Sequence, residues 1–460
     1  MQRLFDSDVS ALPISLREVD NHSRGASIMS DTAPKPEEVR ATTPIWQHEL
    51  NTALSSRERL SAKLMTWLDT LGLHCNPFDA KYLDAGADPN LSSYLVGHEA
   101  FAAIRQDQAA IVFAPIGGGK SAFRVRLARS CRVGEGGRRI LPVIYTLPKP
   151  QQLTGVTNVY ERHLHYILRC LGVELLFALA YRPHEFLDLR SLDRRRVASQ
   201  LAANFPGDLA LQVEQIASEG GLLPLVQLID PSAERLIAEP SAERLQAFCV
   251  ALSDEVHAAN RQIADIKRQP TIHRFQNLVT LIKQTLNFAA IYLLIDGVDA
   301  YVEVITNGRR RLGDLLTPLL QQTGAWAAEN LYSKYFLPNE LLTAVKFSEL
   351  FQPGSITDLK LISIEWTRAS LNAVLQERLR FASDGRFTNL DAICAPNLRG
   401  VQEQLLEVAA PLPREVLALA EQLLLTHVTR LEEPALLEPA DLAMAIAHYQ
   451  GARARQGVAA

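Results

Sequence analysis

Cysteine is scarce in this sequence, and the few cysteines are not paired. The chain of 460 residues contains five cysteines, which lie far apart, and no two of them form a C-x-x-C motif. A domain held together by disulfides needs paired cysteines, and so does the usual structural zinc site. Both are therefore disfavoured, and the cysteine content favours a reducing cytoplasm.

Segments that would direct the chain to a membrane are also missing. The first twenty residues lack the basic start and the long apolar core of a secretory signal. The most apolar stretches, such as residues 286–295, have about half the length that a transmembrane helix needs. We therefore expect a soluble, cytoplasmic protein without a membrane partner.

Neither sign of charge is in large excess. The formal net charge is -4 and the isoelectric point is near 6.3. This balance disfavours a general electrostatic attraction to nucleic acid, although it leaves room for a local basic patch. The composition, 47% hydrophobic and 21% charged, is that of an ordinary globular protein, and the length allows two or three domains.

The most informative stretch is AAIVFAPIGGGKSAFRVRLARS, residues 109–130. Its apolar run at residues 111–113 predicts a buried parallel strand, because such a run without alternation suits a strand covered on both faces. Residues 122–129 predict a helix. A strand, a glycine-rich turn and a helix in this order are typical of a loop that binds phosphate.

The residues of this turn each have a role in holding an anion. Glycines can wind into a nest of backbone N–H groups, the lysine adds a positive charge, and the serine offers a hydroxyl to Mg²⁺. The start of the following helix also favours negative charge. The other interpretation is a glycine-rich turn with a solvated lysine. The predicted binding residues are Gly117, Gly118, Gly119, Lys120, Ser121 and Ala122.

A second apolar run, IYLLIDGVD at residues 291–299, ends in a carboxylate. A buried strand here delivers Asp296 to the carboxyl end of the sheet, where α/β proteins bind their ligands. Together with the phosphate loop, this strand predicts a site in which Ser121 and Asp296 hold Mg²⁺.

The run LLIDGVD is similar to the hhhhDGhDE Walker B signature of NACHT and related STAND ATPases, a branch of the P-loop fold close to AAA+. The resemblance implies that Asp296 holds Mg²⁺ and that Asp299 and Lys120 act in ATP hydrolysis. Ala300 stands where the signature has glutamate, so turnover is expected to be slow, with Asp299 or Glu303 replacing the missing acid.

Three further segments resemble these ATPases. YLVGHE at residues 94–99 is similar to their vGRe element, with His98 in place of arginine, although Gly97 could equally begin a helix. Residues 366–380 match the segment between the last strand and the lid, and residues 411–424, PLPREVLALAEQLL, resemble the sPRdlirl segment. The last resemblance implies that Arg414 reaches the nucleotide phosphates. A solvated arginine in a first helical turn is the alternative.

The expected fold is α/β, a P-loop NTPase with a parallel sheet. A large helical insert is expected between strands two and three, and an all-α lid domain at the C-terminal end. Strands are predicted at 111–113, 139–145, 291–295, 334–339 and 359–366, with Pro142 placing the second near an edge. The expected domains are a disordered leader (1–44), N-terminal helices (45–74), the ATPase core (75–366, with the insert at 150–288), the lid (367–450) and a frayed tail (451–460).

The function expected from these features is a nucleotide-controlled switch that binds ATP and Mg²⁺ and turns over slowly. Relatives of this type are frequent in bacterial signalling and phage defence, and we expect a homo-oligomer or a separate effector or sensor protein. The alternatives are a DNA-acting AAA+-like loader, a small-molecule kinase and a nucleotide-binding scaffold without hydrolysis. Two arginine runs, 194–196 and 309–311, are either solvated faces or contacts to phosphate, and the second could supply an arginine finger.

Overall fold

The computed structural model describes residues 45–79, 90–148, 158–229, 240–298, 309–341, 359–431 and 435–455. Four features expected from the sequence lie outside these residues: the leader at 1–44, Asp299, Ala300 and Glu303. The side chains of residues 309–314, which include the second arginine run, also lie outside the described part.

The centre of the protein is a five-stranded, all-parallel sheet with the order β2-β3-β4-β1-β5. Each predicted strand is present within a few residues, and Pro142 lies in β2, an edge strand as predicted. The prediction for the fifth strand was too long, because Thr367 caps the next helix and the chain leaves the sheet before it. The strands are β1 (Ala110–Ala114), β2 (Ile140–Thr146), β3 (Ala290–Asp296), β4 (Leu331–Pro338) and β5 (Lys360–Ser363).

Helices cover both faces of this sheet. Alternate residues of β1 point to opposite sides, so that Ile111 and Phe113 join one hydrophobic cluster while Val112 joins another. Helices α15 (Arg309–Leu320) and α16 (Thr323–Ala328) lie on the first side, and α3 (Ala100–Ile104) and α4 (Lys120–Val133) on the second. This double coverage explains why β1 and β3 are buried at every position.

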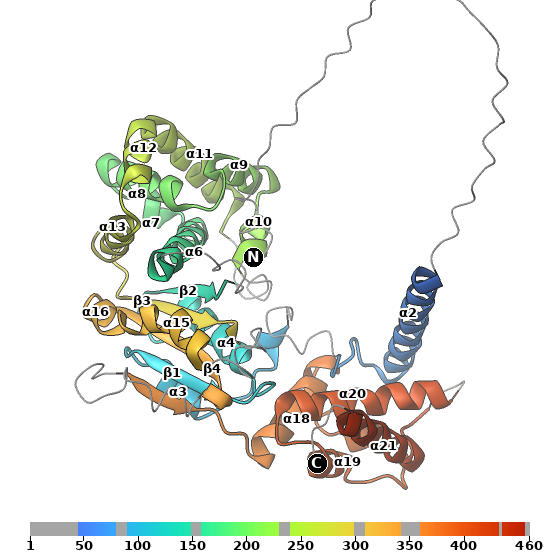
Figure 1. Ribbon diagram of the computed structural model, residues 1–460. Helices are drawn as coiled ribbons and strands as arrows, with labels where there is room; N and C mark the ends of the chain where they lie inside the picture. The colour runs from blue at the N-terminus through green and yellow to red at the C-terminus, as the bar shows by residue number, and fades with distance from the viewer. Residues whose placement is uncertain are drawn as a thin grey trace, which may run out of the picture.

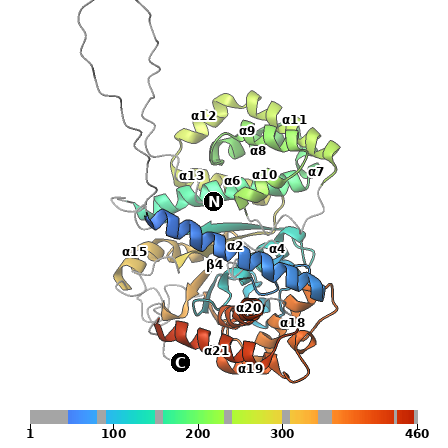
Figure 2. The same cartoon turned by 90° about the vertical axis from the view of Figure 1, so that its right-hand side faces the viewer.

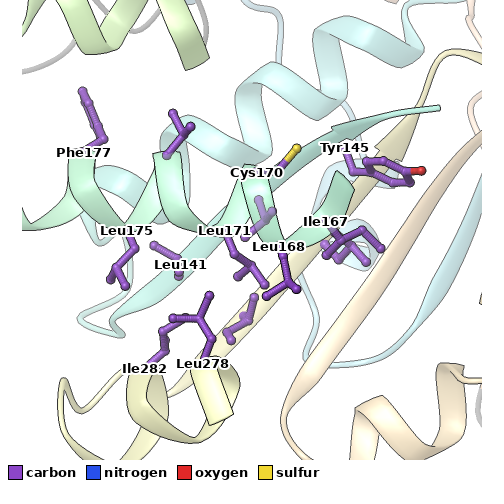
Figure 3. Packing of buried hydrophobic residues seen from close by; sticks show 14 of the residues in the cluster. Leu141, Tyr145, Ile167, Leu168, Cys170, Leu171, Leu175, Phe177, Leu278 and Ile282 are labelled. Carbon is purple, nitrogen blue, oxygen red and sulfur yellow. The ribbon is translucent and has the colours of Figure 1, made fainter. Parts of the chain in front are cut away.

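The described helices between β2 and β3 belong to one helical region, which lies on the first side of the sheet (Figure 1). Figure 3 shows Leu171 of its first helix packed near Leu141 of β2 and near Leu278 and Ile282 of its last helix. The helices are α6 (Val159–Tyr181), α7 (His184–Leu187), α8 (Ser191–Asn204), α9 (Leu209–Glu219), α10 (Leu223–Ile229), α11 (Ala242–Ala258), α12 (Asn260–Arg268) and α13 (Thr271–Gln284).

Helix α6 corrects the expectation that no apolar stretch is long enough to cross a bilayer. It has 23 residues and the composition of a membrane span, but 78% of its most apolar window is buried inside the protein. It packs against β2, α8 and α13. Its burial is that of a core helix in a soluble protein.

The C-terminal part is a separate helical layer with its own hydrophobic cluster. Its helices are α18 (Arg368–Ala382), α19 (Val401–Val408), α20 (Pro413–Arg430) and α21 (Pro439–Arg455). The tail expected to fray from residue 451 is instead helical to Arg455, because α21 packs along α20. Short 3₁₀ turns occur at Leu91–Ser93, Asn339–Leu341 and Leu390–Ile393.

The segment expected to hold N-terminal helices, residues 45–74, contains one helix, α2 (Ile45–Leu71), and this helix joins the C-terminal layer. Its Trp67 indole donates a hydrogen bond to the Ala435 carbonyl at 2.7 Å, and its Lys63 ammonium donates to the Leu431 carbonyl at 2.6 Å. Figures 1 and 2 show the end of α2 beside these helices. Helix α2 therefore groups in space with the C-terminal helices, although the whole sheet lies between them in the sequence.

A buried histidine connects α6 to the sheet and to α15. The Nε2–H of His163 donates to the Leu315 carbonyl at 2.9 Å, so Nδ1 accepts from the Tyr145 hydroxyl at 2.6 Å. The side chain is fully buried, and this burial lowers the pKa of His163 from 6.5 to about 4. The neutral ring is therefore the form that suits the folded protein.

We expect His163 to make the protein less stable in mild acid. Between pH 6.5 and pH 4, His163 is protonated in the unfolded chain but stays neutral in the folded chain. The free energy of unfolding therefore falls as the pH falls. The contribution lost between pH 7 and pH 5 is on the order of 2 kcal/mol. Urea unfolding at both pH values should show a smaller loss in His163→Gln than in the wild type. The exposed control His257→Gln should keep the wild-type loss, and equal losses in all three proteins would contradict this account.

Candidate functional site

The loop between β1 and α4 has a conformation that requires glycine. Gly117 and Gly119 have φ angles of +83° and +85°, and Gly118 N–H donates to the Pro115 carbonyl at 2.9 Å to close the turn. Gly119 is the N-cap residue of α4, so the first N–H groups of a 14-residue helix follow the loop directly. The predicted binding residues, including Ala122 in the first turn, therefore surround one helix N-terminus.

Lys120 points into this loop. Its ammonium donates to the Ala114 and Pro115 carbonyls, each at 3.1 Å, and the residue is only 3% exposed. The loop's own carbonyl oxygens thus hold the positive charge at the centre of the turn. An anion in the loop would meet both this charge and the N–H groups of the helix.

The second predicted motif meets the first across the sheet. The Ser121 hydroxyl donates to Asp296 Oδ2 at 3.1 Å, although the two residues are 175 positions apart in the sequence. Asp296 ends β3, while Ser121 lies in the first turn of α4, after β1. Because parallel strands bring their carboxyl ends to one edge, the two motifs form a single site at that edge.

Gly297 allows Asp296 to take this position. Its φ angle is +97°, and a Cβ atom there would lie 2.8 Å from Thr146 Cγ2 on the neighbouring strand. The Gly297 N–H also donates to Asp296 Oδ1 at 2.8 Å. A residue with a side chain would be strained and would clash, so the glycine after the aspartate has a structural cause.

Arg124 is a member of this site that the sequence reasoning missed. Its Nε atom lies 3.2 Å from Asp296 Oδ2, and the two side chains are 12% and 10% exposed. The Nε group makes no hydrogen bond, so the two side chains interact through their opposite charges and not through a directed hydrogen bond. The available signal was its spacing, since a residue three positions after Ser121 lies on the same face of a helix.

A pocket opens between the loop, the segment 91–96 and the C-terminal helices α18 and α20. Among the residues that the structure describes, four cationic side chains and no acidic ones line it, namely Lys120, Arg126, Arg378 and Arg414. Burial lowers the pKa of Arg126, and the charge of Glu135 opposes this shift. Apolar side chains form the remaining wall, namely Leu91, Tyr94, Leu95, Val374 and Leu417. The pocket therefore suits a ligand with one strongly anionic end and one apolar end.

Arg414 lies against the loop. Its backbone N–H donates to the Gly117 carbonyl at 3.4 Å, and a Cβ atom on Gly117 would lie 3.0 Å from Arg414 Cβ. Helix α20 begins at Pro413, so Arg414 is in its first turn. Residues from three distant parts of the sequence thus line one pocket.

Two aromatic residues, Trp366 and His98, make hydrogen bonds next to the pocket. The Trp366 indole donates to the Gly118 carbonyl at 2.9 Å, and His98 Nδ1 accepts from the Ala100 N–H, which leaves Nε2–H to donate to the Glu365 carbonyl at 3.0 Å. The His98 and Trp366 rings meet edge to face with centroids 5.1 Å apart. His98 thus links the start of α3 to Glu365, just before the C-terminal layer.

The donor atoms at this site fit Mg²⁺. Ser121 Oγ and Asp296 Oδ2 are hard oxygen donors, and they already lie within contact distance of each other. Among the described residues no group of three or more His, Cys, Asp or Glu side chains could hold a metal by itself. A magnesium ion here would need further ligands from water or from a bound phosphate, which is its usual mode of binding.

Asn339 and the first arginine run are less closely connected to the site. Asn339 follows β4, and the pairing of Pro338 with Ala114 places it next to the start of the loop with an exposed side chain. In the first arginine run, Arg194 and Arg195 both contact Glu255, at 3.6 and 3.1 Å. That single carboxylate offsets only part of the positive charge of the run, which also includes the exposed Arg196.

Comparison with known proteins leaves the assignment to the geometry of the site. No protein-family model, curated protein or solved structure matches this chain. The residues and contacts of the site are therefore the basis for assigning a function.

The Trp366 hydrogen bond generates a testable expectation. Trp366→Phe keeps a ring but removes the N–H donor to Gly118, and we expect a loss of about 1 kcal/mol in stability. If the loop binds ATP, as the sequence predicts, the variant should also bind ATP about tenfold more weakly. Calorimetric titration with ATP and urea unfolding measure the two effects.

Trp67→Phe is the matched control, because it removes an indole bond of similar length between α2 and residue 435. It should lower stability without changing the affinity for ATP. If both variants bind ATP as the wild type does, Trp366 has no role in shaping the loop.

Proposed function

We propose that this chain binds ATP and Mg²⁺ at the loop between β1 and α4 and acts as a nucleotide-controlled switch. The single observation that carries the proposal is the contact between Ser121 and Asp296. Two motifs with complementary roles in holding Mg²⁺ and phosphate were predicted independently, and their key side chains meet at the edge of the sheet where ligands bind.

The parallel arrangement of the strands supports the same proposal. In the STAND and AAA+ ATPases that the two motifs resemble, the phosphate loop and the Walker B strand belong to one site, and parallel strands bind ligands at their carboxyl ends. Here β4 lies between β1 and β3. The C-terminal helical layer then corresponds to the lid of that group, and the helices from α6 to α13 form an insert between the second and third strands.

The charges of the pocket support a triphosphate rather than a neutral ligand. Lys120 and Arg414 lie at the loop, where they would contact phosphate oxygens, and the apolar wall around Tyr94 would take the base. Mg²⁺, when bound, would offset part of the charge on the phosphates. Arg414 belongs to α20 and the phosphate loop belongs to the sheet, so a bound nucleotide would favour one relative arrangement of the two layers.

Slow turnover follows from the sequence departure at Ala300, where a glutamate is expected in the family that the motif resembles. A switch that holds its nucleotide for long periods suits signalling, and we propose a cytoplasmic protein that acts as a homo-oligomer or with a separate effector or sensor. Bacterial signalling or phage defence is the setting that the resemblance suggests.

A nucleotide-binding scaffold without hydrolysis is the second candidate. Arg124 favours it, because this residue already supplies a positive charge to Asp296. A DNA-acting loader is less well supported, since the whole chain has a formal net charge of -4 and Glu255 offsets part of the charge of the arginine run at residues 194–196.

ATP binding should depend on Lys120. Calorimetry should detect binding to the wild type and no measurable binding to Lys120→Ala, because the variant loses the charge at the centre of the loop. Lys360→Ala is the matched control. Lys360 is the first residue of β5 and pairs with Ala110, the first residue of β1, so it lies at the end of the strands opposite to the loop. It should bind ATP normally, and unchanged affinity in Lys120→Ala would reject the phosphate-loop assignment.

Hydrolysis, if the switch turns over, should depend on Asp296. A sensitive phosphate-release assay should give a slow rate for the wild type and a rate at least about tenfold lower for Asp296→Asn, which loses the charge that faces the metal. A wild type that binds ATP but releases no phosphate above background supports the scaffold instead. A steady rate retained in Asp296→Asn contradicts the role given to this residue.

A further inference from the structure

The carboxylate proposed to face Mg²⁺ already has a cationic partner in this chain. Asp296 Oδ2 lies 3.1 Å from Ser121 Oγ and 3.2 Å from Arg124 Nε. The same Asp296 oxygen therefore contacts both Ser121, the other proposed ligand of Mg²⁺, and the Arg124 guanidinium. The other oxygen, Oδ1, accepts from the Gly297 N–H.

We propose that Arg124 and Mg²⁺ compete for this Asp296 oxygen, so that Arg124 sets the Mg²⁺ concentration at which the nucleotide site is completed. The inference rests on the proposed function, since it assumes that ATP and Mg²⁺ bind here. Arg124 acts through Asp296 and is a positioning residue rather than a catalytic one.

Electrostatics gives the reason for competition. A divalent cation at Oδ2 would then lie within a few ångströms of a second positive charge, in a site where both side chains are about nine-tenths buried. Like charges repel strongly at such short range when little water screens them.

The contact also explains how the site stays formed without metal. A buried carboxylate without a partner is unfavourable, and Arg124 removes that cost from Asp296. Because the Nε contact lacks the geometry of a hydrogen bond, it can be exchanged for a metal ion more easily than a directed pair. The expected result is a protein that binds ATP with a weak dependence on Mg²⁺ until the ion reaches a high concentration.

The test is a Mg²⁺ titration at a fixed concentration of a fluorescent ATP analogue, with the midpoint of the fluorescence change as the readout. Arg124→Met removes the charge but keeps most of the chain length, and its midpoint should be about tenfold lower than that of the wild type. Arg129→Met removes an arginine from the same helix away from Asp296 and should keep the wild-type midpoint. Equal midpoints in the wild type and Arg124→Met would overturn the proposal.

Thermal unfolding gives a second readout that needs no nucleotide. In EDTA, Arg124→Met should melt at a lower temperature than the wild type, because the buried Asp296 carboxylate loses its cationic partner and keeps only hydrogen bonds from Ser121 and Gly297. Mg²⁺ alone should raise the melting temperature of Arg124→Met more than that of the wild type, and this difference should disappear in Arg124→Met combined with Asp296→Asn. A rise that persists in the double variant means that Mg²⁺ binds elsewhere and contradicts the proposal.

The two proposals fail in different ways. If the wild type binds no ATP analogue at any Mg²⁺ concentration, the proposed function is wrong. If it binds the analogue but its midpoint does not respond to Arg124, only the competition is wrong. Should Arg124→Met not fold, Arg124→Gln carries the same expectation, since its neutral amide also removes the charge.

Discussion

The structure depends on the parallel pairing that brings the ends of β1 and β3 to one edge of the sheet. This pairing places Ser121 against Asp296, although the strands that carry them are separated by β4 and by the helices from α6 to α13. Parallel strands need long crossover connections, so the chain can place a large helical region between β2 and β3 without moving the site. Adjacent pairing of β2 with β3 keeps both ends of that region together.

The C-terminal layer contacts the phosphate loop at two points. Trp366 holds the Gly118 carbonyl from the start of the layer, while Arg414 approaches Gly117 from the first turn of α20. Helix α2 packs on the far part of the same layer through Trp67 and Lys63. A change at the loop therefore has a direct physical route into helices at both ends of the described chain, which is what a switch requires.

Burial decided several features that local patterns could not. Helix α6 is apolar enough to suggest a membrane span, yet its residues lie between the sheet and the helices around it. Helix α2 precedes the sheet in the sequence, yet its apolar side packs on α20. Periodicity indicates that a helix has an apolar face, but it does not say which surface covers that face. The prediction of strand positions was better, because buried parallel strands are short, continuous apolar runs.

The sequence by itself determined the chemistry of the loop: Gly117 and Gly119, which permit its positive φ angles, Lys120 for charge, and Asp296 at the end of an apolar strand. These properties are local, since they depend on backbone freedom and on the order of residues along one strand or turn. Only the tertiary structure decided that Asp296 shares one oxygen between Ser121 and Arg124. Distances between residues far apart in the sequence follow from strand order and packing, which no short motif encodes.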